Sequence, residues 1–225
     1  MRILINSLFF FIFSFITSVQ AFPIPKDGKI NFDIIRKNKI IGTHEILFSE
    51  KDNYLYIETI IDIKVKIFFV TAYEFFHQST EVWKDGKFIR IDGHSNFEDE
   101  REYFIEGEVK DGFLFASGMD GNLKLDKNII PSNFWNIDVM YQEKIFDTQK
   151  GIVRKLDVRE AGIETITINN IKIDCTKFIL NATRHPKDKD QFPEYTLWYS
   201  KEKELIKFNF RSTISNKMIE IIRKK

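Results

Sequence analysis

The chain has 225 residues, of which 43% are hydrophobic and 30% charged, and its formal net charge is +1. This length suits one domain with a full core. The near-zero net charge gives no reason to expect nucleic acid or an anionic membrane surface as a partner.

The first twenty-one residues have the pattern of a secretory signal peptide. Arg2 supplies a short positive region, Ile3 to Ile16 is nearly all apolar, and Val19-Gln20-Ala21 offers small residues where a signal peptidase inspects them. The apolar run is shorter than the roughly 20 residues of a spanning helix, and no basic stop-transfer flank follows it. We therefore predict a signal peptide over 1–21, a single domain over 22–225, a periplasmic or secreted location, and no stable membrane anchor after cleavage.

The remaining chain alternates in the manner of antiparallel strands. In Leu55–Ile67 the odd positions are mostly apolar, whereas Tyr56, Glu58, Asp62, Lys64 and Lys66 occupy even positions. Such strands have one buried and one solvated face, as in antiparallel sheets. Similar stretches are Lys29–Ile35, Lys39–Phe48, Thr71–Trp83, Lys87–Asn96, Glu102–Glu108, Phe113–Ser117, Ile152–Glu160, Glu164–Asn169, Lys172–Ala182, Glu194–Ser200, Leu205–Arg211 and Met218–Ile222.

Turn signals separate these stretches. The dipeptide Asp-Gly occurs at 27–28, 85–86, 92–93, 111–112 and 120–121. Both of its residues tolerate positive φ, so it predicts hairpin turns. The expected fold is mostly β: a curved antiparallel sheet or incomplete β-barrel of ten or more strands, with one short helix.

The stretch Thr71–Trp83 carries the most unusual chemistry. Tyr73, Phe75, His77, Glu81 and Trp83 share one face of the predicted strand, which puts three large aromatic side chains beside an imidazole and a carboxylate. One interpretation is a binding surface with apolar walls and a few polar groups that orient a guest. The other is plain core packing, with His77 and Glu81 hydrogen-bonded to each other or to water.

The segment around residues 131–140 breaks the alternation. It contains Pro131, and its apolar residues Phe134, Ile137 and Met140 have helical spacing. Ser132 or Asn133 could cap a helix there. We predict the short helix near 133–140, against one face or one mouth of the sheet.

Two later features have plain structural interpretations. Cys175 is the single cysteine, so the chain forms no internal disulfide, and we expect a small buried residue in a strand. The prolines and dense charges of Arg184–Pro193 predict an exposed loop, with a partner-binding flap as the sharper alternative.

The sequence offers little support for catalysis. The four histidines, His44, His77, His94 and His185, show no metal-ligand spacing. The chain has no Gly-x-Ser-x-Gly motif and no glycine-rich phosphate loop. We therefore nominate no catalytic residue, no metal site and no cofactor.

Short motifs resemble those of known exported proteins. The strand end, charged turn and following strand at Leu197–Phe208 distantly resemble the half-barrel fold of the outer-membrane lipoprotein carriers, although Ser200 stands where Asp is usual. A closer resemblance, to an exported bacterial family of unknown function that is largely β, rests on Ile40–His44, Asp62–Lys66, Tyr73–Phe75, Glu81–Gly86, Phe134–Asn136 and Asp147–Gly151. This resemblance implies compartment and fold, and it supplies no site residues.

Three functions are compatible with these observations. The first is a non-catalytic protein that binds an apolar or amphiphilic ligand such as a lipid, through Tyr73, Phe75, His77, Glu81 and Trp83. The second is a structural or assembly factor of the cell envelope that acts through protein contacts. The third is an uncharacterised enzyme that uses His77 and Glu81. A hollow interior would favour the first, and a filled barrel with an exposed apolar patch or sheet edge would favour the second.

Overall fold

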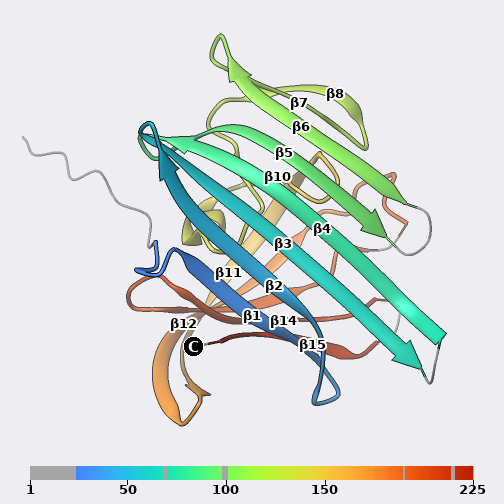
Figure 1. Cartoon of the computed structure of the whole chain (residues 1–225), viewed down its shortest axis with the longest axis vertical. Coiled ribbons are helices and arrows are strands. Elements are labelled where there is room, and N and C mark those ends of the chain that lie inside the picture. Colours follow the sequence, from blue (N-terminus) through green and yellow to red (C-terminus); the bar gives the residue numbers. More distant parts are fainter. Residues whose placement is uncertain (1–23, 68–69, 98–100, 190, 214–215, 225) are drawn as a thin grey trace, which may run out of the picture.

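Fifteen strands join in one sheet in the computed structural model, which describes residues 24–67, 70–97, 101–189, 191–213 and 216–224 (Figure 1). The predicted signal peptide over 1–21 lies outside these residues. No helix in the described ranges is long and apolar enough to cross a membrane. The strands are β1 (Lys29–Arg36), β2 (Lys39–Lys51), β3 (Tyr54–Ile67), β4 (Val70–Lys84), β5 (Lys87–Phe97), β6 (Glu102–Lys110), β7 (Phe113–Gly118), β8 (Gly121–Asp126), β9 (Ile130–Pro131), β10 (Lys144–Asp147), β11 (Ile152–Ile168), β12 (Ile171–Ala182), β13 (Tyr195–Ser200), β14 (Leu205–Arg211) and β15 (Met218–Arg223).

The sheet consists of two meanders joined in its middle. Strands β1 to β8 follow one another in space, β15 back to β9 do the same, and β1 pairs with β15. All pairings are antiparallel except that of β9 with β10. In Figure 1 the first meander forms a broad twisted layer, and the second lies behind it.

The two outer edges of the sheet, β8 and β9, do not pair, so the barrel is incomplete. The curl nevertheless brings the turns beside these edges together, because the Met119 amide donates to the Lys150 carbonyl at 2.8 Å. A Cβ on Gly118 would lie 2.4 Å from Gly151 Cα, so only glycine permits this approach. The predicted curved antiparallel sheet or incomplete barrel is confirmed.

The Asp-Gly dipeptides form turns at four of their five positions. Three close hairpins, as at Asp85-Gly86, where both φ angles are positive (48° and 72°). Asp27-Gly28 forms a turn before β1. Asp92-Gly93 lies inside β5, so the turn prediction is wrong there. A Cβ at Gly93 would meet the Ser79 side chain at 3.3 Å and the Thr148 carbonyl at 3.6 Å, so this glycine serves close packing inside the curl.

Short strands were the hardest to foresee. The sequence did not predict β8, β9 or β10, and it divided β11 into two stretches where the structure has one strand with a register shift between Glu160 and Ile163. The outer part of β11 and β12 folds back over β13 and β14, so that Cys175, Trp198 and Ile206 form a small second core. Cys175 is buried as expected.

The short helix is present but differs in detail from the prediction. It is a 3-10 helix, η1, over Ile137–Tyr141, and its N-cap is Asn136, which accepts from the Asp138 amide at 2.9 Å. The proposed caps Ser132 and Asn133 are wrong because their side chains bind elsewhere. Ser132 contacts Thr148, and Asn133 donates to Glu81.

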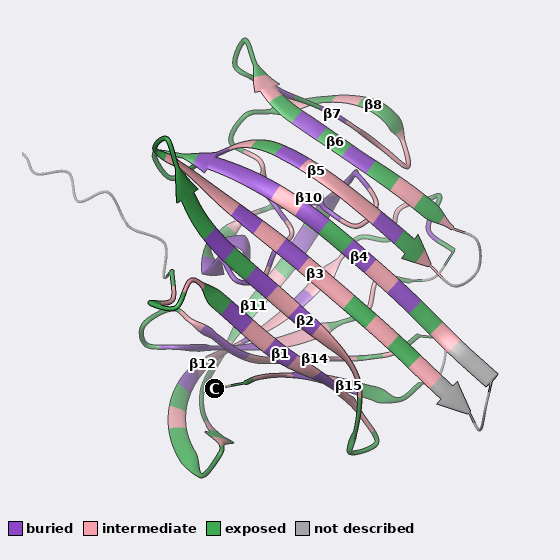
Figure 2. Cartoon of the chain, viewed as in Figure 1, coloured by how far each residue is buried: buried purple, intermediate pink, exposed green. Residues whose placement is uncertain are grey.

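The segment that carries η1 plugs one end of the curl. Trp135 lies 5.4 Å from Phe48 and 5.9 Å from Trp83 between ring centroids, and Trp83 in turn packs against Phe88. Buried and exposed residues alternate along β2 to β6 (Figure 2), and buried residues of these strands such as Phe48, Trp83 and Ile91 belong to the same core as Trp135. We call this region, defined by Phe48, Trp83, Phe88, Ile91 and Trp135, the filled end.

Candidate functional site: a cavity at the other end of the curl

The opposite end of the curl encloses a cavity of about 470 Å³, which we call the hollow end. Its walls come from both meanders, since Ile34 and Ile63 belong to the first and Phe208 and Ile221 to the second. Fourteen of the 27 described residues that line it are polar or charged, and the other thirteen are aromatic or aliphatic. These thirteen are Ile34, Ile61, Ile63, Tyr73, Phe75, Phe97, Phe134, Phe192, Pro193, Tyr195, Phe208, Phe210 and Ile221.

Strand β4 divides the five predicted binding residues between the two ends. Tyr73, Phe75 and His77 line the cavity. Glu81 and Trp83 do not, because the plug covers the part of β4 that carries them. The structure therefore brings together three of the five residues and places the other two in the filled end.

Glu81 is a structural carboxyl group of the filled end. It is fully buried, and it accepts hydrogen bonds from Trp83 Nε1 at 2.8 Å and from Asn133 Nδ2. Burial raises the pKa of Glu81 to about 8, against the opposing effect of these two hydrogen bonds. Glu81 is thus largely uncharged at neutral pH, and each of its oxygens accepts one hydrogen bond, from Trp83 and from Asn133.

His77 has a different partner from the one that the sequence suggested. Its Nδ1 lies 2.8 Å from the Ser95 hydroxyl, across the β4–β5 pair. Burial lowers the pKa of His77 to about 4, and the charge of Asp147 offsets part of this effect. The two groups of the enzyme hypothesis, His77 and Glu81, therefore serve separate hydrogen-bond networks. Ser95 is buried and does not line the cavity.

A second histidine, His44 on β2, also lines the cavity. Its ring packs 5.4 Å from Phe32 and 6.1 Å from Phe208 between centroids. Burial, together with nearby His77, lowers the pKa of His44 to about 3. Both cavity histidines are therefore neutral at physiological pH.

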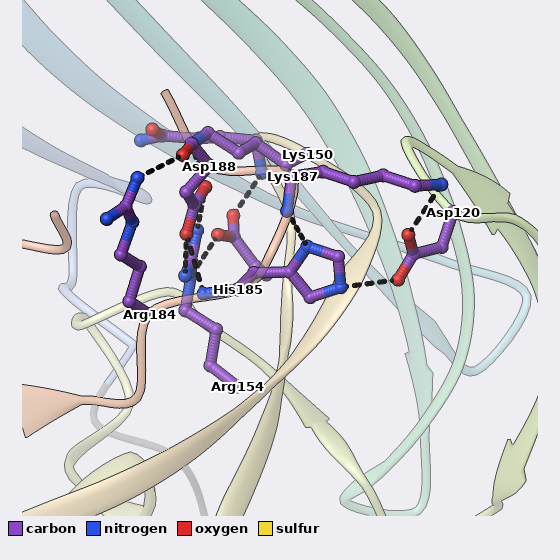
Figure 3. Close-up of polar contacts among 9 residues, drawn as sticks. Asp120, Lys150, Arg154, Arg184, His185, Lys187 and Asp188 are labelled. Atoms are coloured by element: carbon purple, nitrogen blue, oxygen red, sulfur yellow. Dashed lines mark hydrogen bonds and ion pairs between the residues drawn. The ribbon is translucent and has the colours of Figure 1, made fainter. Parts of the chain in front are cut away.

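One side of the cavity carries a buried ion-pair network (Figure 3). Arg154 Nε donates to Asp147 Oδ2 at 2.5 Å, and its Nη1 donates to Asp188 Oδ2 at 2.8 Å. Lys150 also pairs with Asp188. Burial alone would lower the pKa of Arg154 and raise that of Asp188. The ion pairs and hydrogen bonds outweigh burial, so the pKa of Arg154 is raised and the pKa of Asp188 is lowered. Each group of this network thus has an oppositely charged partner within the wall.

The loop after β12 connects the two edges of the sheet. Asp188 binds Arg154 and Lys150 on the β10–β11 side, while His185 and Lys187 bind Asp120, in the β7–β8 turn, at 2.8 and 3.0 Å (Figure 3). The expectation of a simply exposed loop is wrong at Asp188, which is 4% exposed. We call residues 184–189 the clasp.

Sequence reasoning missed the ion-pair network. The available signal was Arg154, which alternates with Ile152 and Leu156 on the buried face of β11. An arginine at a buried position requires a carboxylate partner. Asp147 lies nearby in the chain, but the partnership with Asp188 depends on the path of the loop, which the local pattern does not show.

The comparisons with known proteins agree with this architecture. The model of a domain of unknown function, DUF6134, matches residues 32–223. The chain belongs to the DUF6134 family. The predicted resemblance to a largely β family of unknown function is thereby confirmed.

A solved structure shares the fold of this DUF6134 protein. It is a beta-barrel-like protein of a domain of unknown function, DUF1849, from Brucella abortus, with a TM-score of 0.59 and 11% sequence identity, covering 88% of this chain and 95% of that chain. No curated protein matches the chain. These comparisons establish family and fold, so the function has to be argued from the cavity.

Proposed function

We propose that this protein is an exported, periplasmic or secreted, non-catalytic protein that binds an apolar or amphiphilic ligand such as a lipid. The cavity carries the proposal. Its volume of about 470 Å³ lies within the range of small-molecule pockets, and its wall combines thirteen aromatic or aliphatic residues with fourteen polar or charged ones, which suits an amphiphilic guest. Core packing alone would not leave such a space, because protein interiors are normally packed to crystal-like density.

The first experiment asks whether a guest binds. Thermal unfolding of the protein without residues 1–21 is measured with a panel of fatty acids, long-chain alcohols, isoprenoids and phospholipids. A guest at a hundredfold excess over its dissociation constant stabilises the fold by about 2.7 kcal/mol. For a domain of this size that corresponds to a rise in melting temperature of roughly 5–10 °C.

Matched variants locate the binding. Phe75→Arg puts a charge into the wall, and Ile61→Phe fills part of the cavity with an apolar ring; both residues line it. Phe115→Arg is the control, because Phe115 is 42% exposed on β7 and does not line the cavity. We expect the two cavity variants to lose the stabilisation and the control to keep it. A panel without any stabilising compound would contradict the proposal.

Export has its own test. The signal-peptide pattern predicts Phe22 as the first residue of the mature protein. N-terminal sequencing of protein from the soluble envelope fraction should find this residue. An intact Met1 in the membrane fraction would favour an anchored protein.

A second function, an envelope assembly factor that acts through protein contacts, has one observation in its favour. Three aromatic side chains on β6 and β7 are exposed: Phe104 by 66%, Phe113 by 43% and Phe115 by 42%. These strands lie next to the sheet edge, where the outer side of β8 pairs with no further strand. Exposed aromatic side chains next to an open sheet edge are typical of docking surfaces. Cross-linking in envelope extracts that requires Phe104 and Phe115 would support it.

A further inference from the structure

An unusual patch of buried polar side chains adjoins the cavity and reaches it through two histidines. His44 on β2, Thr59 on β3, and His77 and Ser79 on β4 are all at most 7% exposed. The strand register places them on one face, since Ile61 pairs with both His44 and His77, and Thr59 pairs with Ser79. They form a contiguous patch, which we call the polar floor.

The polar floor is short of hydrogen-bond partners. Among the described residues, His44 Nε2, Thr59 Oγ1, His77 Nε2 and Ser79 Oγ are buried without one. A buried polar atom without a partner costs about 1–3 kcal/mol, and folded proteins satisfy nearly all such atoms. Two of the four, the histidine nitrogens, belong to residues that line the cavity. A polar group inside the cavity is therefore the natural partner for His44 and His77.

The rest of the site indicates which charge that group has. Both imidazoles are neutral because of their burial. The wall carboxylates Asp147 and Asp188 are already matched by Arg154 and Lys150. The further cation of the lining, Arg101, lies over the Phe97 ring, in the row of Phe75 rather than that of His77. A charged group at the floor would thus be buried without a counter-charge, which is costly, whereas a neutral one would not.

The position of the floor fixes the orientation. His44 packs on Phe32, which belongs to the solid core, so the histidines lie at the inner end of the cavity. The exposed lining residues Gln191 and Thr213 lie in loops and mark its opening. Between the two, aromatic residues such as Phe75, Phe97 and Phe210 line the cavity together with the ion-pair network of Asp147, Lys150, Arg154 and Asp188.

We propose that the guest enters with its polar end first and that this end is an uncharged hydroxyl, seated against His44 and His77. The inference rests on the proposed function and narrows it to apolar molecules that end in an alcohol. A hydroxyl both donates and accepts a hydrogen bond, so it can satisfy two neutral imidazoles at once. The apolar body then lies among the aromatic side chains toward the opening.

The test uses four probes with one twelve-carbon chain: dodecan-1-ol, its methyl ether, dodecanoate and dodecyltrimethylammonium. Affinities are measured by isothermal titration calorimetry below micelle-forming concentrations, on the protein without residues 1–21. We expect the alcohol to bind at least about tenfold more tightly than the ether, which cannot donate, and than either ion, because each of these leaves buried polar groups unpaired.

Paired substitutions of His77 separate its two nitrogens. In His77→Asn the amide replaces Nδ1, so the contact with Ser95 survives and the Nε2 position is lost. In His77→Gln the amide reaches the Nε2 position. We expect His77→Asn to weaken the alcohol about tenfold and leave the ether unchanged, and His77→Gln to retain most of the preference. His94→Asn is the control, since His94 lies outside the cavity lining.

His44→Phe provides an independent readout. The ring fits between Phe32 and Phe208 and removes an unpaired nitrogen, so the empty protein should become no less stable while the preference for the alcohol disappears. Two results would contradict the hydroxyl proposal while leaving lipid binding in place. One is that dodecanoate or the ether binds as well as the alcohol. The other is that His77→Asn and His44→Phe bind the alcohol with the affinity of the parent protein. If none of the probes and none of the panel binds, the proposed function itself fails.

Discussion

The two ends of the curl are built from strands with the same alternation of apolar and polar residues, but one end is packed with side chains and the other encloses a cavity. Strand β4 runs through both, with Glu81 and Trp83 at the filled end and Tyr73, Phe75 and His77 at the hollow end. At the filled end the buried carboxyl group is satisfied by Trp83 and Asn133. At the hollow end the free nitrogen of His77 has no partner among the described residues.

The difference comes from the segment that carries η1. Trp135 packs on Trp83 and Asn133 reaches Glu81, while Ser132, Asn133 and Phe134 border the cavity. The same segment therefore fills one end of the curl and forms part of the cavity wall at the other. The lesson is that a strand's own alternation tells which side chains face inward, but a distant segment decides whether they meet protein or open space.

The largest expected effect contrasts one aromatic residue from each end. Trp83→Ala should lower the free energy of unfolding by about 3–5 kcal/mol, because the ring is buried against Trp135 and Phe88. Phe210→Ala should cost less than about 2 kcal/mol, because Phe210 is only partly buried and already borders empty space. Urea denaturation measures both. Equal losses would mean that the two ends are equally well packed.

The ion-pair network should matter nearly as much. Arg154→Met leaves Asp147 and Asp188 buried without their main partner, and we expect a loss of about 3–5 kcal/mol. The control is Arg90→Met, whose exposed pair with Asp92 should contribute within about 0.5 kcal/mol. A small effect of Arg154→Met would show that the hollow end tolerates water around these charges.

The dependence of stability on pH should separate the ends. His44 and His77 have lowered pKa values of about 3 and 4, so only the unfolded chain binds their protons below pH 6.5, and stability falls as the solution is acidified. Glu81 has a raised pKa of about 8, so the folded protein retains a proton that the unfolded chain loses above pH 4.5, and stability falls as pH rises toward 8.

Together these groups place the most stable pH near 6.5, the ordinary histidine value. The net loss from pH 6.5 to 8 should be about 1 kcal/mol, because Glu81 lowers stability by at most about 1.4 kcal/mol per pH unit and the histidine protons that the unfolded chain still binds near pH 6.5 offset part of this. Glu81→Gln should abolish this alkaline loss, because an amide oxygen still accepts from Trp83 and does not titrate. Denaturation curves from pH 4.5 to 8 test it. An unchanged alkaline limb in Glu81→Gln would assign that loss to another group.

The smallest effect concerns the clasp. Asp120→Asn weakens its pairs with His185 and Lys187, which are partly exposed, so we expect a loss of at most about 1 kcal/mol that shrinks at high salt. The variant should nevertheless speed the release of any guest, since residues of the same loop line the cavity. Stopped-flow dissociation measures this. Unchanged release would mean that guests leave past another part of the opening.

Most of the sheet could be predicted because its strands follow local rules. Leu55–Ile67 alternates cleanly, and the prediction differs from β3 by one residue at its start. Strand β9, with two residues, is too short to carry a pattern, and Asp92-Gly93 resembles a turn although its glycine is set by contact with β4 and Thr148.

The sequence predicted only part of the candidate site. The shared face of Tyr73, Phe75, His77, Glu81 and Trp83 followed from period two, but its division between cavity and plug depends on Trp135, some fifty residues away in the chain. The pairing of Arg154 with Asp188 depends on a loop path of the same kind. Local patterns set the orientation of side chains, while long-range packing sets their partners.

The seam between β1 and β15 has a consequence for how the molecule assembles. Phe32 pairs with Arg223, so this contact joins residues 223 − 32 = 191 positions apart, whereas nearly every other pairing joins neighbours in the chain. Closing the seam is therefore the pairing step with the largest cost in loop-closure entropy. Because the cavity wall includes Ile34 from β1 and Ile221 from β15, the binding chamber comes into being only when that step is complete. A guest that is present when the seam closes would stabilise the closed form, so ligand binding would coincide with the last step of folding.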